Sequence, residues 1–215
     1  METKMAYGNS KLNRDVIKYI AMLTMLLNHI SQVFMKSGYF LSELFLDIGY
    51  FTAITMCYFL VEGFQYTHSK KNYAIRLLIF ALISEIPYCM AFTTNGVLEF
   101  QGLNMLFTLL ICFMILIVND KVSNKFLKDI CILGLIVLSL FCDWALLAPI
   151  FTLLFIWSRG LRNKMKYTFI ISMLLFGLFN FVGGIGRFSL GTNIAYALGS
   201  MRSEEHTSEL QSQRD

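Results

Sequence analysis

Residues 57–87 read CYFLVEGFQYTHSKKNYAIRLLIFALISEIP, in which two apolar stretches flank a short polar turn. Both stretches continue outward until each holds the ~20 residues that a ~30 Å hydrocarbon core requires. Glu62, Arg76 and Glu85 lie inside these stretches, where an ionisable side chain is energetically costly and rare. The pattern therefore predicts two membrane-crossing helices that carry three candidate functional residues.

The composition of the whole chain supports the same class of protein. Hydrophobic residues make up 56% of the sequence and charged residues only 15%, with a mean hydropathy of +0.60. A soluble domain carries a much larger charged fraction, so the composition predicts an integral membrane protein. The first 18 residues are polar and basic and run directly into an apolar stretch. This is not the pattern of a cleaved signal peptide, and we expect the N-terminus to be retained.

Two other kinds of chemistry are disfavoured by the sequence. The five cysteines are scattered through apolar stretches without C-x-x-C spacing, which argues against a disulfide framework and against zinc, and no metal is expected. We interpret them as small buried hydrophobic residues. The basic residues are spread over several loops without aromatic neighbours on which bases could stack, so nucleic-acid binding is not expected.

The last fourteen residues, 202–215, differ abruptly from everything before them. They read RSEEHTSELQSQRD, and the first eleven match the translation of a common sequencing-adapter sequence. We interpret this segment as a foreign tail and residues 1–201 as a single transmembrane domain. His206 and the acidic residues of the tail are then without function.

Apolar runs recur along the domain at membrane-spanning length, separated by short polar turns. Seven runs are complete, and an eighth is interrupted by the tail: 16–36, 43–66, 73–93, 103–118, 127–141, 145–157, 166–182 and 188–201. The fifth and sixth runs are short and meet at Asp143, so they form either a tight pair or a re-entrant hairpin. The predicted fold class is an all-α polytopic membrane protein, a bundle of about eight transmembrane helices whose last helix is truncated.

The distribution of Lys and Arg predicts the orientation. Fourteen lie in one alternate set of segments: Lys4, Lys11, Arg14, Lys18, Lys70, Lys71, Arg76, Lys121, Lys125, Lys128, Arg159, Arg162, Lys164 and Lys166. The other set holds only Lys36 and Arg187. Because basic loops stay in the cytoplasm, the N-terminus is predicted to be cytoplasmic.

His29 is the strongest candidate for proton transfer. It lies thirteen residues into the first run, and Glu85 lies at a similar depth in the third. Thr24, Asn28 and Gln32 recur at helical spacing and draw a polar stripe beside His29, which should face the bundle or a wet cavity. A histidine titrates near neutral pH and can serve as a base, with Glu85 or Asn28 orienting the ring. The alternative is a histidine that only hydrogen-bonds between packed helices.

Glu62 and Arg76 flank the polar turn symmetrically, so they are predicted to meet at equal depth. One interpretation is an ion pair that holds two helices in register. The other is a basic mouth for an anionic ligand, because guanidinium groups suit phosphates. The residues of that mouth would be Arg76, Lys70, Lys71 and His68.

Three further polar residues are placed near the outer face. Asp143 could contact an acceptor amine or hydroxyl, and the adjacent Trp144 is interpreted as an interface anchor. Asn104 and Thr108 lie one helical turn apart and could line the same cavity as His29. They could equally be helix-packing hydrogen bonds.

The segments IKYIAMLTMLLNHI (17–30), the 48–87 stretch that ends in ALISEIP, and LNMLFTLLICF (103–113) resemble the TraX family of bacterial membrane proteins. The likeness covers most of residues 16–159. The family is implicated in N-terminal acetylation of conjugative pilin and is similar to multi-helix membrane acyltransferases. The resemblance implies that His29 is the acyl-transfer base, that Glu62 and Arg76 belong to a VEGF-hairpin-Arg signature, and that Glu85 belongs to an SEIP motif.

The chain departs from the family pattern at several positions. Asn28 stands where the family commonly has Asp before the histidine, and an amide cannot offset a developing imidazolium charge. Tyr50 and Ile54 stand where the family often has Arg and Pro. These differences put the acceptor and full activity in question.

The combined expectation is an acyltransferase of the bacterial inner membrane that passes acetyl from cytoplasmic acetyl-CoA to an amine or hydroxyl. The acceptor would be a pilin N-terminus, a surface glycan or a lipid. The alternatives are a transporter or flippase whose buried charges line a substrate path, or a noncatalytic assembly scaffold.

Overall fold

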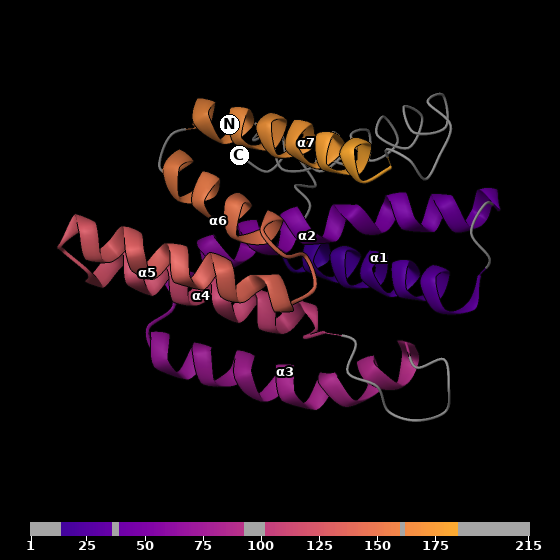
Figure 1. Ribbon diagram of the computed structural model, residues 1–215, viewed down its shortest axis with the longest axis horizontal. Helices are drawn as coiled ribbons and strands as arrows, with labels where there is room; N and C mark the ends of the chain where they lie inside the picture. The colour runs from indigo at the N-terminus through magenta and orange to yellow at the C-terminus, as the bar shows by residue number, and fades with distance from the viewer. Residues whose placement is uncertain (1–13, 36–38, 93–101, 160–161, 185–215) are drawn as a thin grey trace, which may run out of the picture.

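The computed structural model describes residues 14–35, 39–92, 102–159 and 162–184, and Figure 1 shows their arrangement. These residues form α-helices and one 3₁₀ turn, with no strand among them. The elements are α1 (Arg14–Phe34), α2 (Phe40–Tyr66), α3 (Lys70–Phe92), α4 (Met105–Lys121), α5 (Lys125–Leu138), η1 (Ser139–Phe141), α6 (Leu147–Ser158) and α7 (Arg162–Gly184). The all-helical class expected from the sequence is confirmed for this part of the chain.

Each of the first seven apolar runs coincides with one helix, α1 to α7. Within the described residues, α1, α3 and α7 are long and apolar enough to cross a membrane by length and composition. A total of about eight transmembrane helices therefore stays a prediction. The eighth run (188–201), the tail (202–215), Lys36 and Arg187 lie outside the described residues.

Asparagine side chains fix the starts of two helices. Asn104 Oδ1 accepts a hydrogen bond from the Leu106 amide at 2.9 Å, and Asn124 Oδ1 accepts from the Leu127 amide at 3.3 Å. An N-cap acceptor satisfies one of the backbone donors that the first turn leaves without a helical partner. These caps explain why α4 and α5 begin after the polar turns.

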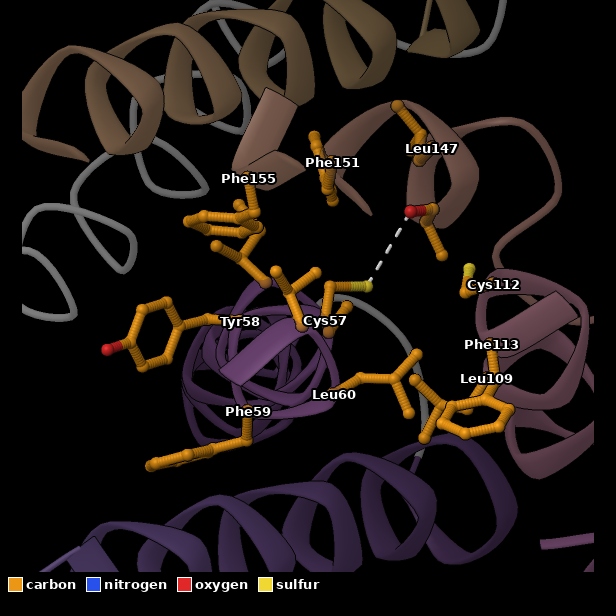
Figure 2. Packing of buried hydrophobic residues seen from close by; sticks show 14 of the residues in the cluster. Cys57, Tyr58, Phe59, Leu60, Leu109, Cys112, Phe113, Leu147, Phe151 and Phe155 are labelled. Atoms are coloured by element: carbon orange, nitrogen blue, oxygen red, sulfur yellow. Dashed lines mark hydrogen bonds between the residues drawn. The ribbon is translucent and has the colours of Figure 1, made fainter. Parts of the chain in front are cut away.

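The central element is α2, which packs along α1 and also contacts α4 and α6. Most residues from 52 to 64 are buried, including Cys57, Leu60 and Phe64. Figure 2 shows Phe113 of α4 and Phe155 of α6 directed at this helix. The described cysteines are all free thiols, and the Cys57 thiol donates to the Ala148 carbonyl of α6 at 3.7 Å.

The helix α3 does not pack along α2, although the two are joined by a three-residue turn. Its main neighbour is α4, and it lies on the far side of α4 from α7 (Figure 1). Much of its surface is exposed and apolar, as at Phe80, Leu82 and Ile83. Exposed apolar side chains of this kind suit contact with lipid.

The α2–α3 and α4–α5 connections, the end of α6 and the start of α7 gather at one end of the bundle (Figure 1). We call this the basic end, because it carries Lys70, Lys121 and Arg159. An ion pair between Lys70 Nζ and Asp120 Oδ2 at 2.6 Å joins two of these connections. The clustering agrees with the alternation expected from the sequence, while the cytoplasmic assignment of this end stays a prediction.

A glycine allows the close approach of α1 and α2. A Cβ atom built at Gly49 would overlap Cβ, Cγ and Nδ2 of Asn28 on α1. By contrast, a Cβ at Gly134 on α5 would meet no atom within 4 Å. Gly49 is therefore a contact position, whereas Gly134 has open space around it.

The substitution Gly49→Ala should destabilise the fold by about 1–3 kcal/mol, because an added methyl overpacks the α1–α2 contact. The matched control, Gly134→Ala, should be neutral or stabilising by up to ~1 kcal/mol, since Ala has a higher helix propensity than Gly at an exposed position within a helix. Thermal unfolding of both variants in detergent measures the difference. Equal behaviour of the two variants would contradict the assigned contact.

Candidate functional site

A cavity of about 530 Å³ lies between α1, α2, α7 and the turn that connects η1 to α6. It lies toward the end of the bundle opposite the basic end, since it meets α4 at its first residue and α7 in its last turns. Most of its wall is apolar or aromatic. The side chains with strongly polar groups are Asn28, His29, Gln32, Asp143 and Asn180.

The first wall is the polar stripe of α1. Thr24 Oγ1 and Thr52 Oγ1 of α2 are 2.8 Å apart and share a hydrogen bond, and Thr52 Oγ1 also donates to the Ala21 carbonyl at 3.0 Å. One turn on, the Gln32 amide donates to Asn28 Oδ1. The stripe faces the bundle and the cavity, as expected from its spacing.

His29 is half-buried at this wall, and the structure brings two residues near it. The Tyr88 ring of α3 meets the imidazole edge to face, with centroids 6.3 Å apart and planes at 74°. The Asp143 carboxylate lines the same cavity from the η1–α6 turn. His29 thus contacts an aromatic ring and shares its cavity with a carboxylate.

The opposite wall is the turn from Cys142 to Leu146, which adopts an unusual backbone. Trp144 and Leu146 have φ values of 58° and 64°, in the left-handed region that bulky residues rarely occupy. The Asp143 amide donates to the Leu103 carbonyl at 2.7 Å, and the Trp144 amide donates to Asp143 Oδ1 at 3.0 Å. The Trp144 ring stacks on Phe176 of α7 in the cavity wall, with centroids 5.2 Å apart, so it is more than an interface anchor.

Glu85 does not line the cavity, although its depth matches that of His29. Its Oε2 accepts hydrogen bonds from the backbone amide of Asn104 at 3.1 Å and from Asn104 Nδ2 at 2.8 Å. Asn104 Nδ2 is also within hydrogen-bond distance of the Ala81 carbonyl. The reason is the packing of α3 on α4, which turns this carboxylate to the first turn of α4 instead of to α1.

Thr108 and Asn104 also stand behind the cavity wall instead of in it. Thr108 Oγ1 donates to the Asp143 carbonyl, so it supports the turn that carries Asp143. Both residues are buried. Of the two alternatives open for them from the sequence, the packing hydrogen bond matches the geometry.

The basic end has a different arrangement from the predicted mouth. Arg76 Nε donates to the Asn72 carbonyl of its own helix at 3.3 Å, and Glu62 Oε1 accepts from Tyr58 at 3.4 Å. Within the described part of the chain, no ion pair joins Glu62 to Arg76. The main packing partner of α3 is α4 and not α2, which explains why this ion pair does not form.

Lys70 is the basic residue with the best-defined partners. Its ammonium pairs with Asp120 and lies 4.1 Å from the centroid of the Phe64 ring. The hydrogen bond from Lys70 lowers the pKa of the Asp120 carboxyl below its ordinary value. His68 and Lys71 are exposed in and beside the same turn.

Comparison with known proteins adds the family. The sequence pattern of the TraX protein family matches residues 13–207. The chain belongs to the TraX family. It is also 33% identical over 143 residues to a probable fimbrial assembly protein FimC, serogroup H1, of Dichelobacter nodosus. That match covers 64% of this chain and 59% of the relative, so the chain spans about three fifths of the relative's length. No solved structure matches.

In this TraX chain, sequence reasoning missed two cavity residues. Tyr88 comes directly after the SEIP motif (84–87), and no spacing in the sequence links this tyrosine to His29. Asn180 is a single amide in an apolar helix, and its Nδ2 donates to the Phe176 carbonyl at 3.2 Å. A lone polar residue of that kind within a predicted span is a signal that could have identified it.

Removing the Glu85 carboxylate should destabilise this TraX chain without direct effect on the cavity. Glu85→Ala removes the acceptor of the Asn104 backbone amide and one acceptor of Asn104 Nδ2, at a cost of about 1–3 kcal/mol. Glu85→Gln keeps a side-chain oxygen that can accept from Asn104 and should lose less.

Thermal unfolding of both variants, with exposed Asp129→Ala on α5 as the control, measures this effect. If Glu85→Ala unfolds at the wild-type temperature, the Asn104 contacts do not hold α3 to α4.

Proposed function

We propose that this TraX chain is a membrane-embedded acyltransferase that acts in pilus or fimbria assembly. The donor is acetyl-CoA, and the acceptor is an amine or hydroxyl. The observation that carries the proposal is the placement of His29 in an otherwise largely apolar cavity, together with the family membership. The relative named as a fimbrial assembly protein supports the biological setting.

The chemistry assigned to His29 is general base catalysis. The imidazole takes the proton from the acceptor as the acceptor nitrogen or oxygen attacks the thioester carbonyl. The carbon–sulfur bond then breaks, and the proton on His29 passes to the leaving thiolate. A base held beside the acceptor is suited to this step, because it takes the proton as the new bond forms.

The cavity suits the reacting groups better than the phosphates of the donor. None of its described lining residues is Lys or Arg, and Asp143 would repel an anion. The basic end, with Lys70, Lys71, His68 and Arg76, has the chemistry that phosphates require. The core between the two ends includes Phe113 and Phe155, so donor entry at the basic end requires a path beside these rings.

The substitution His29→Ala should lower acetyl transfer by about 10²–10⁴-fold, the range that a positioned base contributes. The measurement is CoA release and label transfer from radiolabelled acetyl-CoA by protein purified in nanodiscs. The matched control is His206→Ala, in the predicted foreign tail, which should keep full activity.

Transfer retained by a folded His29→Ala variant would overturn the assignment of the base. Inactivity of the wild type, with no binding of acetyl-CoA, would overturn the acyltransferase proposal. Substrate flux into proteoliposomes without CoA release would then favour a transporter, and neither flux nor turnover would favour an assembly scaffold.

The role of the basic end can be tested through the ion pair. Asp120→Asn frees Lys70 and removes a negative charge, so it should lower the KM for acetyl-CoA. Lys70→Ala should raise that KM by up to about tenfold, equivalent to ~1.4 kcal/mol. Steady-state kinetics over a range of acetyl-CoA concentrations, with Asp129→Asn as the control, provide the measurement. An unchanged KM in both variants would contradict donor binding by Lys70.

A further inference from the structure

We infer that Asp143 is a positioning residue that stabilises the protonated His29 imidazole from the opposite wall of the cavity. This inference rests on the proposed function, in which His29 carries a proton during transfer. The carboxylate comes from the η1–α6 turn and not from the position next to His29, where this chain has Asn28. The amide of Asn28 is neutral, so residue 28 itself supplies no counter-charge to the imidazolium.

The first argument is the charge inventory of the cavity. Among its described lining residues, Asp143 is the only Asp, Glu, Lys or Arg. Asp143 and His29 line the same cavity, one from the η1–α6 turn and the other from α1. In a largely apolar surrounding, a single carboxylate has a larger effect on an imidazolium than it has in water.

The second argument is the way in which the turn holds Asp143. Two bulky residues, Trp144 and Leu146, adopt positive φ values, and each such residue costs about 1–3 kcal/mol. The turn is held by hydrogen bonds from outside it: the Thr108 hydroxyl donates to the Asp143 carbonyl, and the Ser139 hydroxyl accepts from the Leu146 amide at 3.3 Å. Strain maintained by surrounding contacts is common at functional sites.

The third argument is that Glu85, the carboxylate that the sequence suggested as a partner of His29, is already engaged. Glu85 of α3 accepts two hydrogen bonds from Asn104 at the start of α4. The other titratable groups among the described residues of the cavity wall are Tyr88 of α3 and Cys142 of the turn. Neither is a carboxylate, so Asp143 is the described lining residue that can supply a counter-charge to an imidazolium.

The test uses Asp143→Asn, which keeps the shape and an oxygen that can accept from the Trp144 amide. In the nanodisc assay, we expect kcat to fall at least about tenfold, with the KM for acetyl-CoA unchanged. Asp143→Glu should recover part of the loss. The matched control is Asp129→Asn on the exposed surface of α5, which should behave as wild type.

A double-mutant cycle separates this role from a structural one. In a His29→Ala background, Asp143→Asn should cause no further loss of activity, because the carboxylate acts through the imidazole. Fully additive losses, or an unfolding temperature that falls in proportion to the loss in kcat, would overturn the inference.

A measurement without turnover distinguishes failure of the inference from failure of the proposed function. Nitrogen NMR of labelled His29 reports its protonation as pH is varied in nanodiscs. The midpoint should change in Asp143→Asn and stay at the wild-type value in Asp129→Asn. If the midpoint changes although the wild-type protein transfers no acetyl group, the His29–Asp143 coupling stands and only the acyltransferase proposal is rejected. If the midpoint does not change, the coupling itself is rejected.

Discussion

The close contact of α1 with α2 is the constraint on which the site depends. Gly49 has no side chain, so Asn28 can pack directly against the α2 backbone. This close approach brings the Thr24 and Thr52 hydroxyl groups within hydrogen-bond distance, with the polar face of α1 turned inward. His29, the next residue along, is then held at the border of the cavity and away from the lipid-facing side of the helix.

The opposite wall depends on the first turn of α4 and not on α6 alone. Leu103 and Thr108 bind the backbone of Asp143, while Asn104 binds Glu85 of α3. The short segment 103–108, at and just before the start of α4, therefore holds both the turn that bears Asp143 and the helix that bears Tyr88. The use of one segment for both sets of hydrogen bonds has a physical basis, because every polar group in hydrocarbon requires a partner within the protein.

Much of the helical architecture could be predicted from local sequence. The length of apolar runs reports the thickness of the membrane, and polar residues such as Asn104 and Asn124 mark where helices begin. The spacing of Thr24, Asn28 and Gln32 identified the face of α1 that turns inward. The ion pair that one interpretation of Glu62 and Arg76 predicted is absent from the described part of the chain, because α3 packs mainly on α4 although it follows α2 directly.

The sequence alone determined that this is an all-helical chain of the TraX family, with His29 on an inward-facing polar stripe. Only the tertiary structure decided which polar residues share a site: it brought Asp143 and Tyr88 to the cavity that His29 lines, and it paired Glu85 with Asn104. The physical reason is that helical periodicity specifies the direction of a side chain from its own axis. The identity of the facing residue depends on which helices pack together, and that is set by contacts between distant parts of the chain, such as Gly49 against Asn28.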